Sequence, residues 1–417
     1  MNSYEEYLVK LQRRLKRIEE NPEPGRIKSN KTRYEIQIEE TIERIEAWRQ
    51  GRPFSNGGDM TAGLLTQAMG FASTGGLMPA FQTTQSHKYL EHAKSRGLPV
   101  EHSCDMTMMP FAMMESGDVP MEDLAICDQH ACTPMMLRGI YVAYQSDNLT
   151  YFIDIPLEQN ECSLKYVAEQ LGEFIEYAEK RFPGIKYDED KLIELQAYSE
   201  EIHGYSYEIY HMLKHKPCPV GGLDAFAGAG GVSKRWAEYT RARRDEIAER
   251  VEKKEAAVPG EKLRMLWTVT RPFFMDPFAI LAKWKIVVPF HYSGPVASWA
   301  PLPGRVFWGN RALSTLEKVA ANALLDQWGH LGSTWVEDMV WVCQELHIDA
   351  IINYCMLGCT ATLGLKRLVE EVALEKLGIP TLQLEGKQWD RSYADEKTIS
   401  DRLQEFAQIC LSQRGLL

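Results

Sequence analysis

Short apolar runs alternate with amphipathic stretches along most of the chain. The order is clearest near the C-terminus, where "IDAIINY" is an apolar, β-branched run and "TLGLKRLVEEVALEKLG" carries apolar residues at helical spacing. Gly378 and Pro380 end this helix in the usual way, and "TLQLEG" has the composition of another strand. The pattern predicts a βαβ unit, in which the two strands run parallel.

The same alternation divides the chain into two α/β regions and two helical ones. We expect doubly wound domains with parallel sheets at 59–162 and 256–417, because short apolar stretches alternate there with amphipathic ones. Residues 1–58 are expected to form a helical N-terminal arm, and residues 163–255 a helical connector between the domains.

Composition narrows the class of protein. A chain of 417 residues with 45% hydrophobic residues is long enough for two domains with separate cores. Its formal net charge of -11 argues against nucleic acid as the main partner. No apolar run approaches the length of a membrane span, and the first helix is charged and lacks a signal-peptide core. We therefore expect a cytoplasmic protein with no membrane contact.

The nine cysteines do not form the pattern of a disulfide framework, because their number is odd and they are scattered through a large chain. Cys162, Cys343 and Cys410 lie in or beside predicted helices, where packing is the ordinary role of a thiol, and Cys218 lies between two prolines. The glycine-rich stretch 221–231 lacks the order of a nucleotide-binding loop and is expected to be a plain loop.

The other five cysteines lie in three turns that each precede a predicted helix. Cys355 and Cys359 follow one strand, Cys127 and Cys132 follow another, and Cys104 follows a short extended run. Each helix start also has a residue that can act as its N-cap or first residue: Asp105 or Thr107, Thr133 followed by Pro134, and Thr360 or Thr362.

Cysteines beside helix N-termini are suited to iron-sulfur ligation. The unpaired N–H groups there lower a thiol's pKa and favour a negatively charged cluster. Three thiolates can hold three irons of a cubane and leave the fourth iron open to a substrate. Packing is the alternative for any single cysteine, and "CDQHAC" with His130 also allows a zinc site, although its spacing matches no zinc-finger pattern.

Two stretches resemble a known family. "DAIINYCMLGCTATLGLKRLVEEVALEKLGIPTLQLEGKQWDRSYADEKTISDRLQEF" and "DLAICDQHACTPMMLRG" with its following "FIDIP" strand are similar to subunits of 2-hydroxyacyl-CoA dehydratases and of ATP-dependent benzoyl-CoA reductases. The resemblance implies two flavodoxin-like (Rossmann-like) domains. The N-terminal arm and the connector match these proteins only in general character.

The resemblance also implies a [4Fe-4S] cluster with one cysteine ligand from each turn. Carried over, these ligands are Cys104, Cys132 and Cys359. The family often has Cys-Asp in its second turn, which here is Cys127, so Cys127 competes with Cys132 for that place. Cys127 and Cys355 are extra thiols, which leaves open the related homodimeric type that carries a double-cubane [8Fe-9S] cluster.

The implied activity begins with one-electron reduction of an acyl-CoA thioester, followed by radical dehydration or by ring reduction. Expected partners are the acyl-CoA substrate, a homologous second subunit or a second copy, and an ATP-dependent iron-sulfur activator, since the chain has no nucleotide motif. An electron-relay subunit and a non-catalytic subunit are the alternatives. By proximity, the candidates for proton transfer are Glu101, His102, Asp105 and His130.

Overall fold

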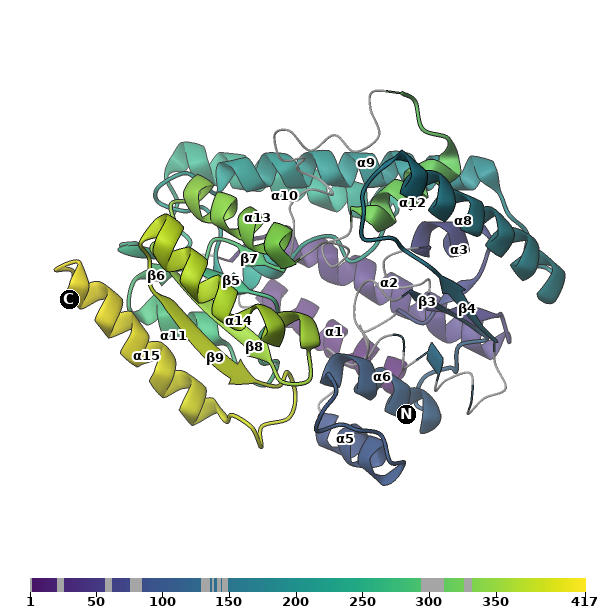
Figure 1. Cartoon of the computed structure of the whole chain (residues 1–417), viewed down its shortest axis with the longest axis horizontal. Coiled ribbons are helices and arrows are strands. Elements are labelled where there is room, and N and C mark those ends of the chain that lie inside the picture. The colour runs from purple at the N-terminus through teal and green to yellow at the C-terminus, as the bar shows by residue number, and fades with distance from the viewer. Residues whose placement is uncertain are drawn as a thin grey trace.

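The computed structural model describes most of the chain (Figure 1). The described residues are 2–20, 26–56, 62–75, 85–128, 136, 139–140, 144, 149–293, 311–325 and 332–417.

The first sheet is parallel and has the strand order β2-β1-β3-β4. Its strands are β1 (Phe54–Ser55), β2 (Ala72–Ser73), β3 (Leu124–Asp128) and β4 (Leu149–Ile153). All five residues of β3 are buried, as expected for a strand that is covered on both faces.

The second sheet is also parallel, with the order β6-β5-β8-β9 and with β7 on the same edge of β5 as β6. Its strands are β5 (Leu263–Thr268), β6 (Ile286–Val287), β7 (His291–Tyr292), β8 (Ala350–Met356) and β9 (Thr381–Gly386). In the first sheet β2 lies on one side of β1, and β3 and β4 follow on the other; in the second sheet β6 and β7 lie on one side of β5, and β8 and β9 follow on the other. This is the flavodoxin-like order, and it confirms the predicted fold class of two parallel-sheet α/β domains.

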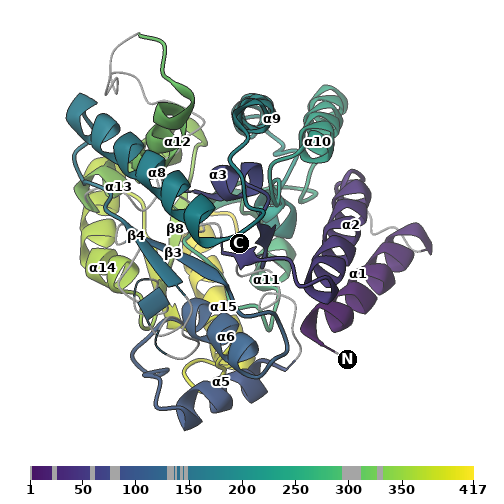
Figure 2. The ribbon, with the colours of Figure 1, turned by 90° about the vertical axis from the view of Figure 1, so that its right-hand side faces the viewer.

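Helices cover both sheets and fill the space between them. They are α1 (Ser3–Glu20), α2 (Asn30–Arg49), α3 (Gly63–Ala68), α5 (Ser86–Ser95), α6 (Asp105–Glu115), α8 (Glu161–Arg181), α9 (Glu189–Met212), the 3-10 helix η1 (Gly222–Phe226), α10 (Lys234–Lys253), α11 (Pro277–Lys283), α12 (Thr315–Leu324), α13 (Gly332–Glu345), α14 (Thr360–Val372), the π-helical turn η3 (Ala373–Leu377) and α15 (Glu396–Gln413). Figure 2 shows α1, α2, α9 and α10 together on one side of the molecule, and α10 contacts both α9 and α2.

Packing crosses the boundaries that the sequence pattern predicts. β1 belongs to the first sheet, although the sequence pattern predicts a helical arm over residues 1–58. α8 packs against the first sheet through Leu164 and Val167, and α12 joins the same core through Val319 and Ala320. The connector therefore contributes α8 and part of α9 to the core of the first domain, and the second domain contributes α12.

Polar side chains cap the N-termini of six of the described helices. The side chain of the N-cap residue accepts a backbone hydrogen bond at α8, α9, α10, α11, α12 and α15, where it belongs to Asn160, Asp188, Ser233, Asp276, Ser314 and Asp395. α6 and α14 differ, because a cysteine occupies the N-cap of each and makes no such bond. Within the described part of the chain, no helix combines the length and apolarity that a bilayer span requires.

Candidate functional site

Cys359 is the N-cap of α14, three residues after β8 ends at Met356. Its side chain is buried and its backbone is extended, with φ -97° and ψ 106°. The Cys359 carbonyl accepts hydrogen bonds from Leu363 N at 3.1 Å and from Thr362 Oγ1 at 3.4 Å. The predicted strand-to-helix turn is therefore present, but Thr362 supports the cysteine rather than capping the helix itself.

Cys104 occupies the same position at the start of α6. It is buried, and its carbonyl accepts hydrogen bonds from Met108 N at 3.2 Å and from Thr107 Oγ1 at 2.8 Å. Residues 100–102 form a turn and residue 103 a bend between α5 and α6, so the expectation of an extended run before Cys104 is wrong. Both sites nevertheless share a cysteine N-cap followed three residues later by a threonine that binds its carbonyl.

The turns that carry these two cysteines lie directly against each other. Gly358 has φ +88°, and a Cβ atom placed on it would lie 2.4 Å from the carbonyl carbon and oxygen of Ser103 and 2.9 Å from Cys104 N. Only a residue without a side chain fits there, for reasons of both backbone conformation and space. Residues 104 and 359 are thus brought together across 255 residues of sequence.

Gln388 connects the two turns. It is fully buried two residues after β9 ends, and its Nε2 lies 3.7 Å from Cys104 Sγ. The same amide nitrogen also contacts Met356 Sδ at the end of β8. Its Oε1 atom makes no hydrogen bond within the described part of the chain. A neutral amide donor therefore points at one of the two cysteine sulfurs.

A buried ion pair holds the Cys104 turn against the second sheet. Lys387 Nζ lies 3.4 Å from Asp105 Oδ1, and both side chains are fully buried. Lys387 also donates hydrogen bonds to the carbonyls of Ser103, at 3.0 Å, and Val100. Asp105 Oδ2 accepts from the backbone N–H of Trp389 at 3.1 Å and of Asp390 at 3.2 Å.

Burial raises the pKa of Asp105, and the charge of Lys387 opposes this shift. Asp105 was a candidate for proton transfer by its place in the sequence. Its contacts instead favour a structural role, in which the ion pair fixes where the Cys104 turn sits.

Cys355 has surroundings unlike those of Cys359. It is completely buried within β8, where Asn353 Nδ2 lies 3.5 Å and Gln383 Oε1 lies 3.4 Å from its sulfur. Burial raises its pKa to about 11, so the group stays a protonated thiol near neutral pH. A positive charge on Lys366 of α14 opposes this shift only in part.

Cys127 is the matching residue of the first sheet. It is the penultimate residue of β3, as Cys355 is of β8, and it is buried. A Cβ atom on Gly139 would lie 1.8 Å from its sulfur, so the chain that follows β3 covers this thiol closely. Cys132 and His130 lie outside the described residues. Among the residues that the structure describes, no three His, Cys, Asp or Glu side chains lie close enough together to hold a metal ion.

The family model for the D-component of 2-hydroxyglutaryl-CoA dehydratase matches residues 65–410. The chain belongs to this dehydratase family. The matched residues include all five cysteines of the three turns, and they leave out α1, α2 and β1. The predicted resemblance to 2-hydroxyacyl-CoA dehydratases is confirmed.

The chain is also similar to a subunit of one such dehydratase. It is 24% identical to the alpha subunit of (R)-phenyllactyl-CoA dehydratase from Clostridium sporogenes over 347 residues, which are 78% of this chain and 80% of that subunit.

Two other predicted site residues of this chain lie at the surface. Glu101 and His102 are exposed in the turn just before Cys104.

Among the cysteines expected to pack in the core, Cys218, Cys343 and Cys410 are buried, and burial raises the pKa of all three thiols. Cys162 is exposed, so that expectation was wrong for this residue.

The sequence pattern missed Lys387 and Gln388. They directly follow "TLQLEG", a predicted parallel strand, and ligand sites in such sheets lie beyond the carboxyl ends of the strands. Applying that rule to β9 as well as to β8 would have placed both residues beside the cysteines.

Proposed function

We propose that this chain is the iron-sulfur subunit of a 2-hydroxyacyl-CoA dehydratase, with Cys104, Cys132 and Cys359 as the ligands of a [4Fe-4S] cluster. The observation that carries the proposal is the contact between the two cysteine-capped turns, where Gly358 allows backbone to meet backbone at Ser103. Membership of the dehydratase family and the similarity to a phenyllactyl-CoA dehydratase subunit support the substrate class.

The donor set fits such a cluster. Cys104 and Cys359 both cap helices, where backbone N–H groups stabilise a thiolate, and neither sulfur shares a cap hydrogen bond with the backbone of its own helix. Gln388 directs an N–H group at the Cys104 sulfur, which also stabilises the anionic form. When bound, the cluster would supply a low-potential electron to the thioester and an open iron to the substrate.

The third ligand would come from the second turn, and the position of Cys127 within β3, where it is buried, supports Cys132 as that ligand. Cys127 and Cys355 hold the same penultimate strand position, and both are covered from the side. Cys132 lies five residues after Cys127, and Cys359 lies four residues after Cys355. Cys132 therefore has nearly the same place in its turn as the proposed ligand Cys359.

The remaining residues have supporting roles. Lys387 and Asp105 hold the Cys104 turn in place, since the lysine binds two carbonyls of the turn and the carboxylate binds the chain after β9. Glu101 and His102 are exposed beside Cys104, where they can exchange protons with a substrate that approaches from solvent.

Two partners complete the proposed enzyme. The similar protein is an alpha subunit, so this chain would work with a second subunit. The electron would come from a separate ATP-hydrolysing iron-sulfur activator, because the glycine-rich stretch 221–231 has no phosphate-binding order.

Anaerobic purification followed by iron and sulfide assays tests the cluster. We expect a brown protein, and we expect it to dehydrate an (R)-2-hydroxyacyl-CoA such as (R)-phenyllactyl-CoA once its second subunit and an activator are added. A colourless, iron-free protein after anaerobic reconstitution would contradict the cluster. A protein that holds iron but only passes electrons to its partner would contradict the catalytic assignment.

A further inference from the structure

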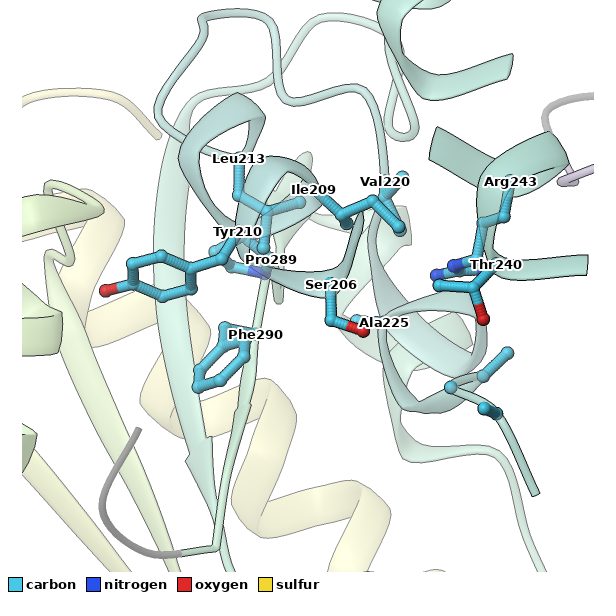
Figure 3. A pocket seen from close by; sticks show the side chains of 13 residues that line it. Ser206, Ile209, Tyr210, Leu213, Val220, Ala225, Thr240, Arg243, Pro289 and Phe290 are labelled. Carbon is cyan, nitrogen blue, oxygen red and sulfur yellow. The ribbon is translucent and has the colours of Figure 1, made fainter. Parts of the chain in front are cut away.

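A pocket with a cavity of about 200 Å³ lies between α9, α10, η1 and the segment that joins β6 to β7 (Figure 3). None of its lining residues belongs to the cysteine turns. Its walls are largely apolar, with Ile209, Leu213, Val220, Pro289 and Phe290 among them.

One charged side chain, Arg243 of α10, lines this pocket although it is only 4% exposed. Its Nη2 donates a hydrogen bond to the carbonyl of Asp224 at 2.5 Å. Its Nη1 is buried and has no hydrogen-bond partner within the described part of the chain. Figure 3 shows the guanidinium directed from α10 toward α9, where the hydroxyl of Ser206 points back toward it.

Arg264 shows how this chain satisfies a buried guanidinium when no ligand is involved. Its Nε donates to Glu261 at 2.7 Å, and its Nη atoms donate to four backbone carbonyls, those of Leu213, Lys214, His215 and Leu346. Arg264 thus has an acidic partner and acceptors for both Nη atoms. Arg243 has neither an acidic partner nor an acceptor for Nη1 among the described residues.

The carboxylate of Asp224 does not compensate for this charge. Asp224 offers Arg243 only its backbone carbonyl, because its carboxylate is already used by the N-terminal arm. Arg26 donates to it through Nε and Nη2 at 2.9 Å each, Ile27 N donates at 3.0 Å, and Asn30 Nδ2 donates at 2.8 Å. A buried cation without a protein counterion is costly unless an anion joins it.

We infer that this pocket binds a small monocarboxylate whose body is an apolar group of about phenyl size, with its carboxylate on Arg243. A carboxylate suits the free donor of a planar guanidinium, and the hydroxyl of Ser206 can donate a second hydrogen bond. An apolar cavity of about 150 Å³ holds benzene, so this pocket has room for a ring and a short acidic arm. The apolar walls match the rest of such a ligand and disfavour a small inorganic anion.

Titration calorimetry with phenylacetate tests this inference on the full chain. We expect one site per chain. The neutral analogue phenylacetamide should bind at least about tenfold more weakly, because a charge-assisted hydrogen bond is lost. Arg243→Met should weaken phenylacetate binding by at least about tenfold for the same reason.

Two further variants guard against a change in folding. Ser206→Leu fills the pocket from α9 and leaves the Arg243 bond to Asp224 in place, so binding should be lost while the melting temperature is kept. Arg241→Met removes an equal charge from the exposed face of the same helix and should leave binding unchanged. The inference is overturned if the wild type does not bind phenylacetate at millimolar concentration, if the amide binds as well, or if Ser206→Leu binds as the wild type does.

Discussion

A Cβ atom on Gly358 would lie 2.4 Å from the carbonyl oxygen of Ser103, so the turn after β8 and the turn before α6 meet backbone to backbone. This contact has no flexible side chain that could move aside. It places the two helix N-termini that carry Cys104 and Cys359 next to each other.

Gly358→Ala should therefore lower both the stability of the fold and the amount of iron that the cysteine site binds. A positive φ in a residue with a side chain costs about 1–3 kcal/mol, and the backbone clash adds to this. We expect the melting temperature to fall and the iron content after anaerobic reconstitution to fall with it. Both can be measured on one preparation.

Gly364→Ala is the matched control. Gly364 lies in the exposed middle of α14, and a Cβ atom there meets nothing within 4 Å. Since alanine is the better helix former, this change should stabilise the protein by about 0.5–1 kcal/mol and leave iron unchanged. An equal loss of iron in both variants would show that the contact between Gly358 and Ser103 does not determine iron binding.

Cys355 and Cys359 should respond differently to replacement by alanine. Cys359→Ala should abolish cluster iron, because a thiolate at a helix N-terminus is lost. Cys355→Ala should keep it, because that thiol is protonated, with a pKa raised to about 11 by burial. Iron assays after reconstitution decide this, with Cys410→Ala as a control for a buried cysteine elsewhere.

The same assay compares a single cubane with a double cubane. A [4Fe-4S] protein holds about four irons per chain and a double cubane about eight. If the wild type holds about eight, Cys355 and Cys127 become ligands, and alanine at either should remove iron. We expect about four, because the turn at Cys104 has a single cysteine.

Gln388→Met should lower the reduction potential of the proposed cluster without removing it. The amide N–H points at Cys104 Sγ, and hydrogen bonds to ligand sulfurs raise the potential by stabilising the reduced state. Loss of one charge-assisted hydrogen bond corresponds to a shift on the order of 60 mV for one electron. A redox titration followed by electron paramagnetic resonance measures it.

Gln383→Met is a suitable control for this shift. Gln383 bonds the Cys355 thiol rather than a proposed ligand, so its replacement should leave the potential unchanged. A larger shift in Gln383→Met than in Gln388→Met would mean that Cys355, not Cys104, is close to the cluster.

Lys387→Met should destabilise the fold strongly, by about 3–5 kcal/mol, because Asp105 would be left buried without its cation. Lys366→Met is the exposed counterpart. It breaks an ion pair with Glu385 whose partners remain in contact with water, so its cost should stay below about 1 kcal/mol.

The defect of Lys387→Met should depend on pH. Burial already raises the pKa of Asp105 in the folded state, and removal of Lys387 raises it further. A carboxyl whose pKa is higher in the folded than in the unfolded state stabilises folding below its unfolded pKa, and this stabilisation is lost as pH rises through the folded pKa.

Chemical denaturation of both proteins at about pH 5 and about pH 8 measures this effect. The deficit of Lys387→Met relative to the wild type should be smaller at the lower pH. Adding Asp105→Asn should remove the pH dependence. A deficit that is the same at both pH values would mean that the lost hydrogen bonds to Val100 and Ser103 explain the damage.

The local patterns of the chain determined its elements and the kind of chemistry at their ends. Apolar runs of strand length and amphipathic stretches of helical length predict two α/β domains, since strand and helix periodicity are properties of neighbouring residues. The position of Cys359 between a strand and a helix follows from the same local signals. The sequence pattern places Cys355 after this strand, whereas the structure places it within β8, because the strand continues to Met356.

Contacts between distant segments were decided only by the tertiary structure. Whether Cys104 meets Cys359 depends on how α6 docks on the end of the second sheet, and no local pattern encodes that docking. The same is true of Lys387 and Gln388, which meet Asp105 and Cys104 across 282 to 284 residues of sequence. The assignment of α8 and α12 to the first core likewise depends on which apolar faces fit together, because burial is non-directional and any apolar stripe could in principle serve.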